Sequence, residues 1–189
     1  MAPPGKRLDP AKAKQEAFRT YQARRSADGF ESVGPGAGAA WKSFVGERGQ
    51  RLRALLQTFH VLGNSRYPPG PQSSLLLVRD VLARMGQPIP DLPSVRLIEW
   101  FISSQGGRPQ GWREVPSGLA QTAANDGRPA VVLGVGLQVS ALGAVVCPDE
   151  SSNAANPTVL MVTDQFALDP GTVLQGFKGQ PVRYFAHGQ

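Results

Sequence analysis

The sequence has a single cysteine, Cys147, and only two histidines, His60 and His187, among its 189 residues. One cysteine excludes an intramolecular disulfide framework and a zinc site built from several thiolates. The two histidines lie far apart in the sequence, and no cluster of further ligands accompanies either of them. We therefore expect no metal site and no cofactor.

Long apolar runs are also missing. A helix that spans a membrane needs about 20 consecutive apolar residues, and the longest candidate, residues 130–146, is interrupted by glycines and by Gln138. The first residues carry charge without an apolar stretch behind them, which is not the pattern of a secretory signal. We expect no membrane span, and a protein that is cytoplasmic or exported without a cleaved signal peptide.

Acidic residues are scarce in the first third of the chain. Residues 1–66 carry 12 Lys and Arg against 5 Asp and Glu, whereas residues 67–189 carry 8 against 9. The excess positive charge therefore belongs to the N-terminal third, where Arg24 and Arg25 end a predicted helix. Such a charge favours an anionic partner, for example nucleic acid, and a solubilising arm is the simpler alternative. No helix-turn-helix or zinc-finger pattern accompanies it.

Apolar periodicity predicts helices first and strands afterwards. Helical spacing or helix-capping residues indicate helices over residues 9–25, 39–62, 73–85, 94–104 and 117–125, with Ser73 or Ser74 capping the third. After Gly127, short apolar runs separated by turn residues indicate strands over 129–133, 143–147, 159–163 and 181–186. This order predicts an α+β fold with an antiparallel sheet of about four to five strands. Residues 1–38 are expected to form a basic helix and linker, and residues 39–189 the α+β domain.

Three segments of the domain share their order and spacing with a known family. The first is the predicted helix that begins near Ser74 and ends at Met85-Gly86, followed by a proline-rich link. The second runs from Ala120-Gln121 to Gly127 and leads into a strand, and the third is Ala141-Leu142-Gly143-Ala144. Together they resemble NlpC-type, papain-like peptidoglycan amidases, in particular the small amidase effectors of type VI secretion. The resemblance covers roughly residues 60–187 and implies a papain-like core.

In that family a cysteine at the helix start attacks the substrate, and a histidine on a facing strand acts as the base. The resemblance places the nucleophile position on Ser74 and the histidine position on Leu142. Serine has a far higher pKa than cysteine, and leucine can neither accept nor donate a proton. We therefore expect no catalytic residue here. The resemblance implies a pseudoenzyme that acts as a binding module for cell-wall material or for a protein of a secretion or phage-tail-like apparatus.

Two alternatives remain open. A divergent cell-wall hydrolase would use Ser74 or Cys147 as nucleophile and His187 as base, although acidic residues beside Cys147 disfavour its thiolate. Nucleic-acid binding would use the basic N-terminal third, including Arg24 and Arg25. Among the tryptophans, Trp112 follows a glycine-rich stretch and is the one that we expect near the surface, in a binding role.

Overall fold

The computed structural model describes residues 44–135, 142–151 and 155–188, which belong to a unit that spans residues 40–189. Three predictions lie outside the described residues: the basic helix over 9–25, the linker up to residue 38, and the roles of Arg24 and Arg25.

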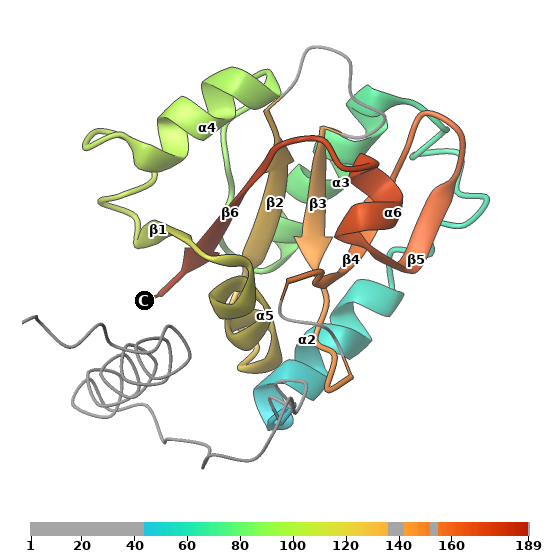
Figure 1. Ribbon diagram of the computed structural model, residues 1–189, viewed down its shortest axis with the longest axis horizontal. Helices are drawn as coiled ribbons and strands as arrows, with labels where there is room; N and C mark the ends of the chain where they lie inside the picture. The colour runs from blue at the N-terminus through green and yellow to red at the C-terminus, as the bar shows by residue number, and fades with distance from the viewer. Residues whose placement is uncertain (1–43, 136–141, 152–154, 189) are drawn as a thin grey trace, which may run out of the picture. The chain divides into compact units, whose positions relative to one another are not determined.

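A six-stranded antiparallel sheet organises the part of the chain that the structure describes (Figure 1). Its spatial order is β1-β6-β2-β3-β4-β5, and every neighbouring pair is antiparallel. The strands are β1 (Trp112–Val115), β2 (Ala130–Gly134), β3 (Gly143–Val146), β4 (Thr158–Val162), β5 (Ala167–Thr172) and β6 (Val182–His187). The α+β class is confirmed, and the prediction of four to five strands is wrong.

The two unpredicted strands lie at the edges of the sheet. β1 has only four residues, of which Arg113 and Glu114 are exposed, so it carries no apolar run. β5 contains Pro170 and Gly171, and the peptide bond before Pro170 is cis. Proline and glycine normally punctuate strands and are tolerated at an edge. This explains why the sequence pattern of β5 indicates a turn.

The helices cover both faces of the sheet. They are α2 (Glu47–Gln57), α3 (Pro71–Arg84), α4 (Ser94–Ile102), α5 (Ser117–Asn125) and α6 (Val173–Phe177). On one face, side chains of α2, α3 and α4 share a core with β2, β3, β4 and β6. On the other face, side chains of α5 and α6 do so. Every residue of β2, β3 and β4 is therefore buried, which explains their continuous rather than alternating apolar runs.

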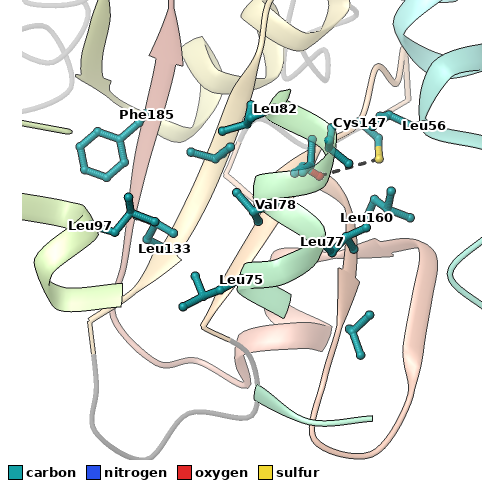
Figure 2. Packing of buried hydrophobic residues seen from close by; sticks show 14 of the residues in the cluster. Leu56, Leu75, Leu77, Val78, Leu82, Leu97, Leu133, Cys147, Leu160 and Phe185 are labelled. Atoms are coloured by element: carbon teal, nitrogen blue, oxygen red, sulfur yellow. Dashed lines mark hydrogen bonds between the residues drawn. The ribbon is translucent and has the colours of Figure 1, made fainter. Parts of the chain in front are cut away.

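Helix α3 supplies more buried side chains to the first core than any other element that the structure describes. Leu75, Leu77, Val78, Val81 and Leu82 are all at most 2% exposed, and Figure 2 shows Leu75, Leu77, Val78 and Leu82 on the helix that packs against the strands. Each such side chain contributes about 1.5–3 kcal/mol when it is fully buried. The helix is therefore fixed firmly against the middle of the sheet.

The start of α3 differs from the prediction. Gly70 occupies the N-cap position and Pro71 the first helical position, so neither Ser73 nor Ser74 caps the helix. Proline suits this position because its missing N–H would have no partner in the first turn. The N–H of Gly70 instead donates to Thr163 O at 2.8 Å. Ser74 thus lies one turn into the helix.

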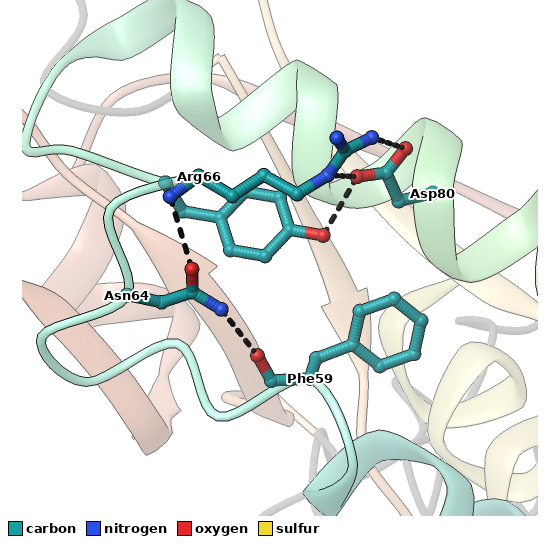
Figure 3. Close-up of polar contacts among 5 residues, drawn as sticks. Phe59, Asn64, Arg66 and Asp80 are labelled. Atoms are coloured by element: carbon teal, nitrogen blue, oxygen red, sulfur yellow. Dashed lines mark hydrogen bonds and ion pairs between the residues drawn. The ribbon is translucent and has the colours of Figure 1, made fainter.

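A polar cluster holds the loop that precedes α3 (Figure 3). The Arg66 guanidinium contacts both carboxylate oxygens of Asp80, at 2.6 and 2.9 Å, and Tyr67 Oη donates to the same carboxylate at 2.7 Å. Asn64 ties the loop together by accepting from the Arg66 N–H and donating to Phe59 O. The bonds from Arg66 lower the pKa of Asp80, and burial raises the pKa of Tyr67 to about 12.

Candidate functional site

Ser74 and the segment that begins at Leu142 lie side by side. Ser74 is fully buried, and its Oγ accepts hydrogen bonds from Leu142 N at 2.9 Å and Gly143 N at 3.2 Å. The same hydroxyl donates to Pro71 O at 2.6 Å. The two positions that the resemblance assigns to nucleophile and base are therefore adjacent in space.

The hydrogen bonds of Ser74 are those of a structural residue. A nucleophilic serine must pass its proton to a base, but here the single hydroxyl proton is directed at the carbonyl oxygen of Pro71. No titratable side chain among the described residues forms a hydrogen bond with Ser74 Oγ. The side chain of Leu142 is half-buried and packs against the core. The hydroxyl therefore joins α3 to the start of β3.

Cys147 lies just beyond β3 and belongs to the same core (Figure 2). Its side chain is 9% exposed, and its Sγ lies 3.8 Å from Val145 O. Burial raises the pKa of the thiol well above its ordinary value, and the charges of Asp169 and Asp149 raise it further. Because the thiolate is the reactive form, this cysteine is a poor nucleophile at neutral pH.

His187 ends β6, displaced from Ser74 along the strands and toward the β1 edge of the sheet. Its Nε2 lies 2.6 Å from Gln110 O, and its ring meets the ring of Trp112 edge to face at 5.2 Å. In the sheet register, Gly143 is aligned with Leu133 and then with Arg183. His187 follows Arg183 by four residues, so its backbone lies about 13 Å along the strand direction from the position aligned with Gly143.

The imidazole of His187 is also removed from Cys147. Strand β2 lies between β3 and β6, so the positions of Cys147 and His187 are separated by two strand spacings, about 10 Å. The imidazole ring contacts Gln110 and Trp112, which lie on the β1 side of β6, away from β2 and β3. The structure therefore brings His187 together with neither Ser74 nor Cys147.

The expected surface role of Trp112 is wrong. Trp112 is fully buried, and its ring packs edge to face on Phe101 at 4.8 Å. The glycine-rich loop before it folds back over the end of α4, since Gly107 N donates to Trp100 O at 2.8 Å and Trp112 N to Gly107 O at 3.0 Å. The loop thus covers the indole, and a large aromatic ring gains more from burial than from exposure.

Two amides on α5 form a polar network that the sequence patterns did not indicate. Gln121 Nε2 donates to Cys147 O at 2.7 Å, and Gln121 Oε1 accepts from Thr158 N at 3.2 Å. Asn125 Oδ1 accepts from Asp149 N at 2.8 Å, and Asn125 Nδ2 donates to Asp149 O at 3.1 Å. The network ties Cys147, Asp149 and Thr158 to α5. The sequence did contain a signal for this network: Gln121 and Asn125 are four residues apart among the alanines of α5, so they lie on the same face of this helix.

Charged side chains gather in a hollow of about 350 Å³ where α4 ends beside β1 and β6. We call it the arginine hollow, and its lining consists of Phe101, Ile102, Arg108, Arg113, Glu114 and Arg183. Arg183 forms a two-pronged ion pair with Glu114, with its Nε at 2.7 Å from one carboxylate oxygen and its Nη2 on the other. The hollow is open to solvent.

Within the described ranges, no group of three or more His, Cys, Asp or Glu side chains is placed to hold a metal ion. The helices between residues 44 and 188 that the structure describes are too short or too polar to cross a membrane. No family model matches the sequence, and no curated protein matches it significantly.

Proposed function

We propose that this domain is a non-hydrolytic relative of NlpC-type amidases and acts by binding another molecule. The observation that carries the proposal is the bonding of Ser74. Its Oγ is buried, receives two backbone N–H groups, and donates its proton to a carbonyl oxygen. An activated nucleophile would instead be exposed to substrate and paired with a base.

The surroundings of Ser74 support the same proposal. Leu142, the residue just before β3 whose N–H binds Ser74 Oγ, has no side-chain proton to exchange, and the side chains of Cys147 and His187 are occupied elsewhere in the fold. Loss of both nucleophile and base leaves no acid–base route to amide hydrolysis, and either loss alone lowers the rate by several orders of magnitude. The scaffold that remains is suited to recognition.

The proposed partners are cell-wall material or a protein of a secretion or phage-tail-like apparatus. The direct test of the missing hydrolysis is digestion of purified peptidoglycan, with released muropeptides measured by liquid chromatography. We expect the same release from the wild type, from Ser74→Ala and from buffer, while an active amidase serves as the positive control. Release by the wild type above that of buffer, lost in either Ser74→Ala or Cys147→Ala, would refute the proposal.

The charge of residues 1–66 favours nucleic-acid binding as a second candidate. Phosphate contacts release counterions, so affinity for DNA should fall steeply as salt rises. A gel shift with the full chain and with an Arg24→Ala/Arg25→Ala variant tests this. Equal binding by the two proteins would count against a role for these arginines.

A further inference from the structure

The arginine hollow has a preformed wall. Arg113 Nη1 donates to Arg108 O and to Trp112 O, both at 2.7 Å, so the guanidinium is held against the loop that leads into β1. The loop is itself anchored to the end of α4 by the bond from Gly107 N to Trp100 O. A ligand that enters the hollow therefore meets one cation, Arg113, whose position is already restricted, which lowers the entropic cost of pairing with it.

The positive charge of the hollow is only partly neutralised by the hollow's own acidic residue, Glu114. Arg183 and Glu114 neutralise one another, and this pairing lowers the pKa of Glu114, so its carboxylate stays ionised. Arg108 and Arg113 form no ion pair with a described residue, although both side chains are exposed. The four charged lining residues thus carry a net charge of +2. Such a concave cationic site favours an anionic ligand.

Apolar atoms accompany this charge. Phe101, which is fully buried, lines the hollow from below, and Ile102 is 39% exposed beside it. Arginine next to an apolar surface is the combination enriched in protein-binding sites. Oligonucleotides bind instead through stacking on exposed aromatic rings and through an extended track of cations. The hollow has neither, because its one aromatic ring is buried and Glu114 interrupts its cations.

We propose that the arginine hollow binds an acidic peptide segment of a partner protein. Carboxylates of the peptide pair with Arg108 and Arg113, whose planar guanidinium groups match the geometry of a carboxylate. An apolar side chain between them packs against Ile102. This proposal deepens the proposed binding function and rests on it, since it names the partner class that a non-hydrolytic domain would recognise.

The test uses the full chain and a fluorescein-labelled peptide, acetyl-Glu-Leu-Glu-Leu-Glu-amide, followed by fluorescence anisotropy. The decisive variant is Arg108→Glu, because Arg108 is exposed and its side chain makes no bond with a described residue. The matched control is Arg48→Glu on α2, which is also exposed and changes the net charge by the same amount. Glutamate suits the first turn of a helix, so the control should fold normally.

We expect saturable binding of the peptide, weakened about tenfold or more by Arg108→Glu and less than about twofold by Arg48→Glu. The same peptide with Gln in place of Glu should bind at least about tenfold more weakly. No saturation up to about 1 mM protein would overturn the proposal. The proposal would also be overturned if the Gln peptide bound as tightly as the Glu peptide, or if Arg108→Glu and Arg48→Glu lost the same affinity for the Glu peptide. Tighter binding of hexathymidylate than of the Glu peptide would overturn it as well. None of these results requires hydrolysis of peptidoglycan, so failure here is distinguishable from failure of the proposed function.

Discussion

Replacing Ser74 with alanine removes an oxygen that joins two elements far apart in the sequence. The hydroxyl is the acceptor for Leu142 N and Gly143 N, and it also donates to Pro71 O. Ser74 is fully buried, and the bond from Gly143 N is buried as well. After the substitution these backbone groups lose their partner, and the small space left by the hydroxyl gives water little access.

The magnitude follows from the number of lost bonds. An intramolecular hydrogen bond contributes about 0.5–1.5 kcal/mol net, and a buried polar group left without a partner costs about 1–3 kcal/mol. Alanine recovers about 0.5 kcal/mol through its higher helix propensity. We therefore expect Ser74→Ala to lower the free energy of unfolding by about 2 kcal/mol. For a chain of this length, that change lowers Tm by about 4–8 °C.

The assay is urea unfolding followed by circular dichroism, with Ser73→Ala as the matched control. Ser73 precedes Ser74 in the same helical turn and is 9% exposed, but its side chain forms no hydrogen bond with a described residue. The control should change stability by less than about 0.5 kcal/mol. Hydrogen exchange at the Leu142 and Gly143 amides should accelerate in Ser74→Ala alone. Equal stability of the two variants would refute the structural role of this hydroxyl.

Three further predictions concern other parts of the fold. Gly49→Ala should lower the free energy of unfolding by about 1–3 kcal/mol, because its Cβ would lie 2.1 Å from a backbone oxygen of α5, whereas Gly46→Ala meets nothing within 4 Å and should lose less than about 1 kcal/mol in the same urea titration, the cost of alanine at an N-cap. Asp80→Asn should destabilise the protein at neutral pH. Its folded pKa is lowered, so its contribution is present above the unfolded value of about 3.9 and is lost as pH falls through the folded pKa. A difference in Tm between wild type and variant that is the same at neutral pH and at about pH 3 would contradict this. Cys147 should react with iodoacetamide at pH about 8 only after unfolding, because burial raises its pKa; stoichiometric alkylation of the native protein, seen by mass spectrometry, would show that the thiol is accessible.

The buried elements were predictable from sequence because their apolar patterns are strong. The face of α3 that carries Leu75, Val78 and Leu82, and the three fully buried strands β2, β3 and β4, lie where the patterns indicate. Short elements without a continuous apolar pattern were missed. α6 has only five residues, yet its start carries a capping box. Thr172 Oγ1 accepts a hydrogen bond from Gln175 N, and Gln175 Oε1 accepts one from Thr172 N. That signal was readable in the sequence.

The candidate site was likewise only partly predictable from the sequence. No periodicity could place Leu142 beside Ser74, since they are 68 residues apart, and only the resemblance suggested that the two positions face each other. The burial of Trp112 depends on how a glycine-rich loop folds over α4, which single-residue preferences do not determine. The ion pair between Arg183 and Glu114 joins strands that are adjacent only in the folded sheet. Sequence therefore indicates the residues buried by strong apolar patterns, and the fold decides which distant residues meet and which loop-covered residues, such as Trp112, are buried.

The most direct test of the central claim asks whether the hydroxyl of Ser74 can act as a nucleophile. The native full-length protein is incubated with a fluorophosphonate, which modifies activated serines, and its intact mass is then measured beside that of Ser74→Ala. The bonding of Ser74 Oγ to Pro71 O, Leu142 N and Gly143 N predicts that both proteins keep their unmodified mass. A single stoichiometric adduct on the wild type, mapped to Ser74 and missing from the variant, would contradict the account.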